Sequence, residues 1–210
     1  MFKPIRWRTF PRDFLVIQFA FLMFGFAIAT MIRANIGTSP WATFEVAMAN
    51  ILHITPGTMT VIDGFIVLSI ALSLREQIGW GTLANILSIG PWEDLALSLI
   101  RPAHDNFPLQ LAMLLVAIGM MGIASGIYIG VSAGAGPRDT LMLGLHRRMG
   151  WSVRAARSSI EGVVVTLGWL FGGPVGIGTL IFAVLIGTSV QTGFKLLRVQ
   201  TRKTVPVGTD

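Results

Sequence analysis

The stretch Gly79-Trp80-Gly81-Thr82-Leu83 returns as Gly176-Ile177-Gly178-Thr179-Leu180, 97 positions further along the chain. At this shift the two halves align without a gap, and about sixteen of some eighty-five positions are identical. Several of the identical residues are Gly or Pro, which fix backbone shape, so the repeat is one of structure. We therefore expect a single domain built from two copies of one unit, repeat one at residues 11–100 and repeat two at residues 108–197. Residues 201–210 are polar and should form a flexible tail.

The composition indicates a membrane protein. The chain is 53% hydrophobic, its mean hydropathy is +0.71, and only 12% of its residues are charged. A soluble domain carries about a quarter charged residues, so this chain has too little polar surface to be soluble alone. It holds no cysteine, which excludes disulfides and thiolate metal sites, and its three histidines are widely spaced. We expect neither a metal nor a cofactor.

Each repeat is predicted to be all-helical, with four pieces in the same order. A long apolar helix comes first, then a Gly/Pro turn and a short helix of roughly ten residues, then two further apolar helices. In repeat one these are 14–32, 42–52, 58–74 and 81–100; in repeat two they are 109–131, 140–149, 158–171 and 178–197. Since crossing the hydrocarbon takes about 20 residues, we expect three transmembrane helices and one short re-entrant or interfacial helix per repeat.

The basic residues predict the orientation of the chain in the membrane. Twelve of the sixteen Lys and Arg fall in three clusters between apolar runs: Lys3, Arg6, Arg8 and Arg12; Arg147, Arg148, Arg154 and Arg157; Lys195, Arg198, Arg202 and Lys203. This distribution follows the positive-inside rule and argues against nucleic-acid binding. It predicts a multi-pass protein of the bacterial inner membrane, with both termini in the cytoplasm and only Arg33 and Arg101 outside.

Three spans per repeat is an odd number, so the two repeats should lie upside down relative to each other. Where a loop of one repeat is rich in Lys and Arg, the equivalent loop of the other repeat is poor in them, as inverted repeats require. Eight crossings with parallel repeats would also place the basic clusters inside. That alternative needs spans of about ten to thirteen residues, one of them containing Glu45, and we favour the inverted arrangement.

Several motifs resemble a known family. They are residues 37–41, residues 134–140 with the leucines and glycine that follow, residues 152–161, and the Gly172-Gly173 pair before Gly176. Together they are similar to the YczE/YyaS/YitT family of bacterial integral membrane proteins, with the YczE branch closest. The resemblance covers residues 14–197, and the Gly-Pro-Arg-Asp block at residues 136–139 is its most specific part. It implies a multi-spanning inner-membrane protein and implies no substrate.

Two acids within predicted spans are candidates for ion coupling. Asp63 lies six residues into its span, and Glu161 lies near the start of the matching span in repeat two. An ionisable group inside a membrane is costly and is a functional candidate by default. The alternative is an acid that stabilises the first turn of its helix or, for Glu161, pairs with Arg157 or Arg154 at helical spacing.

The two Gly/Pro turns are candidates for substrate binding. Each precedes a short helix, whose first N–H groups could hold an anionic or zwitterionic solute together with Arg138. The candidates are Gly37, Pro40, Trp41, Gly134, Gly136, Pro137, Arg138 and Asp139. The alternative is a tight turn with an Arg138–Asp139 pair at the headgroups and Trp41 in the interfacial aromatic belt. Ala42 stands where Asp139 leads us to expect a second acid.

Polar residues also interrupt the last helix of each repeat. One interruption is Gly90-Pro91-Trp92-Glu93-Asp94 and the other is Gly187-Thr188-Ser189-Val190-Gln191. Matching broken helices in two repeats point to a central site, which makes Asn85, Glu93, Asp94 and Gln191 candidates for substrate contact. The alternative is that Pro91 ends the membrane portion, with Glu93 and Asp94 in water.

Duplicated, interrupted helices favour a carrier. We expect a small-solute transporter with alternating access at the interface of two inverted repeats, and no enzymatic activity. The alternative is a non-transporting membrane scaffold or sensor that assists other membrane proteins. The expected partners are the lipid bilayer and a small-molecule or ion substrate, with no nucleic acid; homo-oligomerisation stays open.

Overall fold

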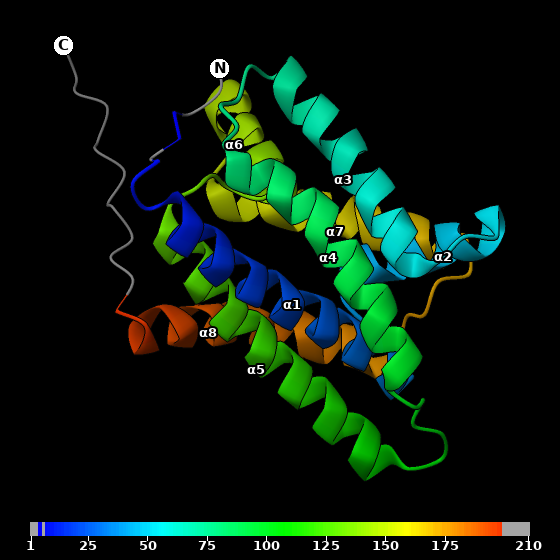
Figure 1. Cartoon of the computed structure of the whole chain (residues 1–210). Coiled ribbons are helices and arrows are strands. Elements are labelled where there is room, and N and C mark those ends of the chain that lie inside the picture. The colour runs from blue at the N-terminus through cyan, green and yellow to red at the C-terminus, as the bar shows by residue number, and fades with distance from the viewer. Residues whose placement is uncertain (1–3, 6, 199–210) are drawn as a thin grey trace.

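A computed structural model describes residues 4–5 and 7–198 of the chain. These residues form eight helices and no strand, which confirms the all-helical prediction (Figure 1). The helices are α1 (Phe10–Ala34), α2 (Pro40–Leu52), α3 (Pro56–Ser73), α4 (Trp80–Leu99), α5 (Phe107–Val131), α6 (Pro137–Met149), α7 (Val153–Leu170) and α8 (Ile177–Leu196). The tail predicted at residues 201–210 lies outside the described residues.

The internal repeat extends to the ends of the helices. Each helix of α1 to α4 begins and ends 97 positions before its counterpart in α5 to α8. The helix ends are also built alike. Asn35 and His53 end α1 and α2 in the left-handed conformation, as Ser132 and Gly150 end α5 and α6. Equivalent local sequences therefore produce equivalent breaks.

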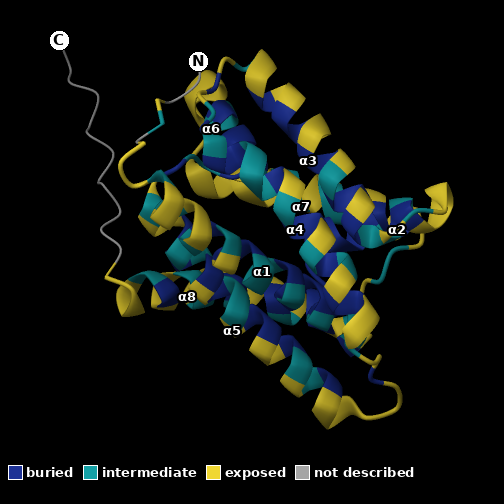
Figure 2. Ribbon diagram, in the orientation of Figure 1, coloured by how far each residue is buried: buried dark blue, intermediate teal, exposed yellow. Residues whose placement is uncertain are grey.

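Four of the described helices are long and apolar enough to cross a membrane: α1, α3, α5 and α8. The other two long helices, α4 and α7, have 20 and 18 residues but carry more polar and charged side chains. Exposed residues cover the outer faces of the helices (Figure 2), and many of them are large and apolar. An outer surface of this kind suits contact with lipid.

The helices form two four-helix bundles, and each bundle takes two helices from each repeat. In the first bundle α1 packs on α5, with α4 along α1 and α8 along α5. In the second bundle the short helices α2 and α6 pack on α7 and α3 of the opposite repeat. Figure 1 shows α1, α5 and α8 below the second bundle, with α4 between α1 and α3.

The two repeats contact each other reciprocally. The α1 and α5 helices run antiparallel: Phe21 lies 5.1 Å from Tyr128 between ring centroids, while Met31 packs with Leu114. The backbone N–H of Gly178 donates to the Ile36 carbonyl at 2.7 Å, and the equivalent N–H of Gly81 donates to Ala133 at 3.1 Å. Each repeat thus holds the first turn of the other repeat's last helix.

The two repeats differ at one contact between the bundles. Helix α3 packs closely along α4, but the equivalent helices α7 and α8 hardly touch. A Cβ atom on Gly90 of α4 would collide with Gly57 of α3, whereas one on the equivalent Gly187 of α8 would meet open space. The bundles are therefore closed together at α3 and α4 and open at α7 and α8.

The prediction of broken last helices is wrong. Both α4 and α8 are continuous through the polar stretches, and Pro91 lies inside α4. The polar groups of α4 find partners on α3 instead: Asp94 accepts hydrogen bonds from the Gly57 N–H at 2.9 Å and from Thr55 at 2.5 Å. The alternative for this stretch is wrong as well for Glu93, which is fully buried.

Candidate functional site

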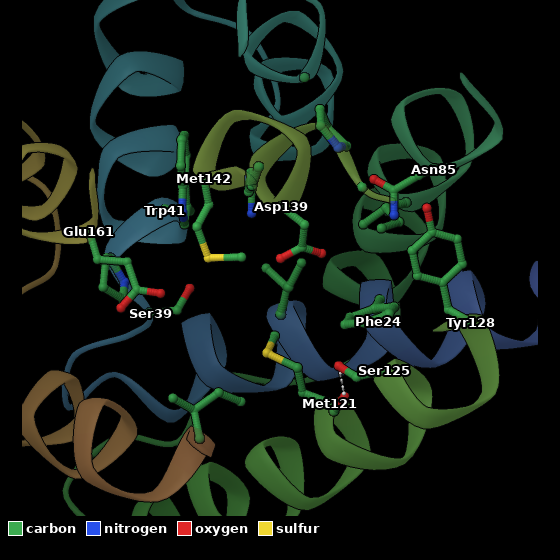
Figure 3. A pocket seen from close by; sticks show the side chains of 18 of the residues that line it. Phe24, Ser39, Trp41, Asn85, Met121, Ser125, Tyr128, Asp139, Met142 and Glu161 are labelled. Atoms are coloured by element: carbon green, nitrogen blue, oxygen red, sulfur yellow. Dashed lines mark hydrogen bonds between the residues drawn. The ribbon is translucent and has the colours of Figure 1, made fainter. Parts of the chain in front are cut away.

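A cavity of about 220 Å³ lies between the two bundles. Residues from all eight helices line it, and most of its wall is apolar. Figure 3 shows α1, α5 and α8 on one side and α2 and α6 on the other, with polar side chains pointing inward. A concave, largely apolar pocket with a few converging polar groups is the usual form of a small-molecule site.

Arg138 begins α6 on the cavity wall and stacks on Trp41 of α2, with its guanidinium carbon 4.4 Å from the ring centroid. The two residues occupy equivalent positions in the two repeats. They meet across the cavity that the first turns of α2 and α6 both line. The ring holds one face of the guanidinium, and a cation–π contact of this kind adds on the order of 1 kcal/mol.

The same guanidinium forms ion pairs with two buried acids of repeat one, Glu45 on α2 and Asp63 on α3. The Nη2 atom of Arg138 lies 3.3 Å from Asp63 and also contacts Glu45. A third buried acid, Glu93 on α4, accepts a hydrogen bond from Thr60 at 2.8 Å. We call Glu45, Asp63, Glu93 and Arg138 the acid–arginine cluster.

The acid–arginine cluster is not fully satisfied. One oxygen of Glu45 and one of Glu93 are buried without a hydrogen-bond partner in the part of the chain that the structure describes. The cluster also holds three acids and one guanidinium, which pairs with Glu45 and Asp63 only, so negative charge is in excess when all are ionised. Buried groups of this kind are expensive and mark functional positions in membranes.

Three further polar side chains face the cavity: Asp139 of α6, Asn85 of α4 and Tyr128 of α5 (Figure 3). Both Asp139 and Asn85 adjoin Gly136, where a Cβ atom would lie 3.5 Å from the Asp139 carboxylate and 3.8 Å from the Asn85 amide. The Tyr128 hydroxyl is buried and unpartnered among the described residues.

At the side where α7 and α8 stand apart, Arg157 and Glu161 of α7 line the cavity. Arg157 donates to the Glu161 carboxylate at 2.8 Å. The pairing suggested by their spacing is thereby confirmed for Arg157. Since Glu161 is half-buried and paired on its own helix, it differs from Asp63, which is buried and paired across repeats.

Most of the residues predicted as a site come together at this cavity. The ones that line it are Pro40, Trp41, Asn85, Gly136, Pro137, Arg138, Asp139 and Glu161, and Asp63 lies just behind Arg138. The turn glycines Gly37 and Gly134 have positive φ values of 101° and 137° and pack against the starts of α8 and α4. Gln191 is exposed on α8, outside the lining.

Sequence reasoning missed Glu45 as a site residue, and it left Glu93 open between a site candidate and an acid in water. The signal for Glu45 is an acid inside the otherwise apolar helix α2, the same signal that marked Asp63. Thr60 and Tyr128 carry no comparable signal, because Thr and Tyr are common in apolar helices without a polar role.

The apolar composition, the long apolar helices and the large apolar side chains on the outer surface define a polytopic α-helical membrane protein. The chain belongs to the family of unknown function DUF6198, whose model matches residues 11–195. The family resemblance found in the motifs is thereby confirmed.

Relatives that match most of the chain include an uncharacterized protein of Haemophilus influenzae and the uncharacterized membrane protein YczE of Bacillus subtilis. Both are 30% identical to the chain, covering 88% and 87% of it and 84% and 82% of their own lengths. The uncharacterized protein YyaS of Bacillus subtilis is 25% identical, with 79% of this chain and 84% of its own covered. No solved structure matches the chain.

Proposed function

We propose that the protein is a small-solute transporter that works by alternating access between its two bundles. The observation that carries the proposal is the cavity with the acid–arginine cluster, closed where α3 packs on α4 and open where α7 and α8 stand apart. In a duplicated carrier, one repeat contact closes as its counterpart opens. The asymmetry of two otherwise equivalent contacts supports such a pair of states.

The path of the chain supports inverted repeats. Along repeat one, α1 runs parallel to α4, since Phe14 stacks on Trp80 at one end and Arg33 donates to the Leu97 carbonyl at the other. Helix α3 runs the opposite way along α4, with Gly57 bonded to Asp94. Three passes per repeat, together with the antiparallel α1 and α5, favour opposite polarity of the two repeats across the bilayer.

We assign the molecule to the bacterial inner membrane with both termini in the cytoplasm. The starts of α1 and α7 and the ends of α6 and α8 carry most of the described basic residues. Arg148 at the end of α6 contacts Leu74, and Phe10 at the start of α1 contacts Trp80. Leu74 and Trp80 flank the short connection between α3 and α4, which supports a common location for these two basic helix ends. By the positive-inside rule that end faces the cytoplasm.

Ion coupling falls to Asp63 within the acid–arginine cluster. Asp63 is buried where α3 of repeat one packs on α6 of repeat two. Any movement of α6 against α3 therefore changes the ion pair between Asp63 and Arg138. A proton or a sodium ion that neutralises part of the excess negative charge would be bound with different affinity in the two states, which is the requirement for coupling. No enzymatic step is assigned to the cavity.

The test has two stages. Purified protein in detergent is screened against small solutes by thermal unfolding, because a ligand that prefers the folded state raises the unfolding temperature. The solutes that bind are then measured for uptake into proteoliposomes under imposed proton and sodium gradients. Saturable uptake that responds to one gradient is expected for the wild type, and loss of that response is expected for Asp63→Asn.

The contrary results are equally specific. Uptake that keeps its gradient dependence in a variant with both Asp63→Asn and Glu161→Gln would remove the coupling assignment. An absence of saturable solute binding would favour the non-transporting scaffold or sensor instead.

A further inference from the structure

Three side chains in the cavity have polar atoms that the fold itself does not use. The Asp139 carboxylate and the Asn85 amide form no hydrogen bond or ion pair within the described residues, and the Tyr128 hydroxyl is 97% buried without a partner. They come from α6, α4 and α5 and point into the same cavity (Figure 3). Of the three, only Tyr128 is buried, while Asn85 is half-buried and Asp139 is exposed on the cavity side. A buried polar group without a partner costs about 1–3 kcal/mol, which a ligand group that reaches the Tyr128 hydroxyl can recover.

The charges around these three side chains favour a cation. Arg138 and Arg157 are the basic residues in the described lining, and each already faces a carboxylate: Arg138 faces Glu45 and Asp63, and Arg157 faces Glu161. Counting Asp139 and Glu93 as well, the acids in and behind the wall exceed the arginines by three. Of the anionic or zwitterionic solute expected at Arg138, this balance disfavours the anion.

The uncharged part of the wall suits an organic cation better than a bare metal ion. Phe24 and Tyr128 present aromatic rings, and Met121 and Met142 also line the cavity (Figure 3). Aromatic faces attract ammonium groups, and thioethers adapt to apolar ligands. The cavity volume of about 220 Å³ suits a small solute.

These three polar residues have no polar counterparts at the equivalent positions of the other repeat. The positions equivalent to Asp139, Asn85 and Tyr128 are Ala42, Phe182 and Met31, all of them apolar. The duplicated fold therefore holds one polar site per chain and not two.

We propose that this cavity binds one small organic ammonium ion per chain, with its charge at Asp139 and its apolar groups against Phe24, Tyr128 and the methionines. Asn85 and the Tyr128 hydroxyl bind polar groups of the same solute. The assignment gives a substrate class to the transporter proposed above, but binding itself does not depend on transport.

The experiment compares three probes of nearly equal shape on the purified full-length protein in detergent. The probes are choline, its uncharged isostere 3,3-dimethylbutan-1-ol, and the anion 3,3-dimethylbutanoate, all at the same ionic strength. Choline should raise the unfolding temperature saturably, with one ion bound per chain by calorimetry, and the other two should not. An equal effect of the neutral isostere, or binding of the anion alone, would overturn the proposal.

Two substitutions test whether the ammonium ion binds at Asp139. Asp139→Asn should weaken choline binding at least tenfold, whereas Asp105→Asn, an equal change of charge in the exposed loop before α5, should leave it unchanged. Retained binding in Asp139→Asn also overturns the proposal. Should that variant fail to fold, the selectivity of the wild type among the three probes still decides.

Binding and transport are separable outcomes. Choline binding without flux in proteoliposomes contradicts the transporter and leaves the ammonium site standing. Saturable flux of an anion without choline binding contradicts the ammonium site and leaves the transporter standing.

Discussion

Arg138 joins the two repeats through one side chain. It lies on α6 of repeat two, stacks on Trp41 and pairs with Glu45 and Asp63, all three of which belong to repeat one. Its removal would leave two buried carboxylates without a cation. Breaking a buried ion pair from one side costs more than the pair contributes, because the remaining charge has no compensation.

We expect Arg138→Gln to destabilise the protein by about 3 kcal/mol, the lower part of the range for buried pairs since the guanidinium is partly open to the cavity. The measurement is reversible unfolding in detergent. Arg154→Gln is the matched control, since Arg154 is exposed on α7, and it should change stability by less than about 0.5 kcal/mol. Equal effects of the two substitutions would mean that the acid–arginine cluster does not stabilise the fold.

Tyr128 separates stability from binding. Its hydroxyl has no partner among the described residues, so Tyr128→Phe removes a polar atom that the fold does not use. We expect the free energy of unfolding to stay within about 0.5 kcal/mol of the wild type or to rise slightly. Choline binding should weaken in the same variant. A large loss of stability would show that the hydroxyl has a structural partner.

The sequence predicted part of this site at the residue level. Asp63 stood out because ionisable side chains are rare in apolar helices, and Arg138 and Asp139 stood out through the turn that precedes them. Asn85 was named from the predicted break in its helix, although α4 is continuous. Which acid pairs with Arg138 could not be predicted, because the pairing crosses from one repeat to the other. The position of Glu93 stayed open, because Pro91, two residues before it, could have ended the membrane portion of the helix and left Glu93 in water.

At the scale of elements, the Gly and Pro pattern predicted the order of the helices well. The observed helices begin one to five residues before the predicted ones, since each predicted start left out the capping turn. The failure at α4 has a physical cause. Pro91 removes one N–H from the helix, but the close packing of Gly90 on Gly57 and the bonds of Asp94 keep the helix continuous.

The equivalent glycines of α4 and α8 give a matched test of the asymmetry between the bundles. A methyl group on Gly90 would collide with the α3 backbone, and one on Gly187 would meet nothing within 4 Å. We expect Gly90→Ala to destabilise by about 1–3 kcal/mol through overpacking. Gly187→Ala should be neutral, or stabilising by up to about 1 kcal/mol, because Ala favours helix. Unfolding of both variants side by side measures the difference.

A result in which both alanines destabilise equally would mean that α8 packs on α7 as closely as α4 packs on α3. The open side of the cavity would then be absent under the conditions of the measurement. The pair thus tests the arrangement of the helices as well as the local packing.

At the scale of the whole molecule, the two bundles each mix helices of both repeats. Repeat one cannot move as a unit, because α1 and α4 lie in one bundle and α2 and α3 in the other. The movement that the architecture permits is that of α2, α3, α6 and α7 against α1, α4, α5 and α8. Such a movement would separate α3 from α4 as α7 approaches α8, with the acid–arginine cluster and the cavity between the moving parts.

That mechanism needs the two repeats to face opposite sides of the membrane, and the chain is well suited to a test because it holds no cysteine. Leu52 and Met149 are equivalent residues at the ends of α2 and α6, with 50% and 53% of their surface exposed. We expect Leu52→Cys to react with a membrane-impermeant maleimide added to intact spheroplasts, and Met149→Cys to react only after the membrane is opened, because the proposed orientation places the first end in the periplasm and the second in the cytoplasm. Labelling of both from the same side would make the repeats parallel. The cavity between the bundles would then have no symmetry-related second state, and the transport proposal would lose its structural basis.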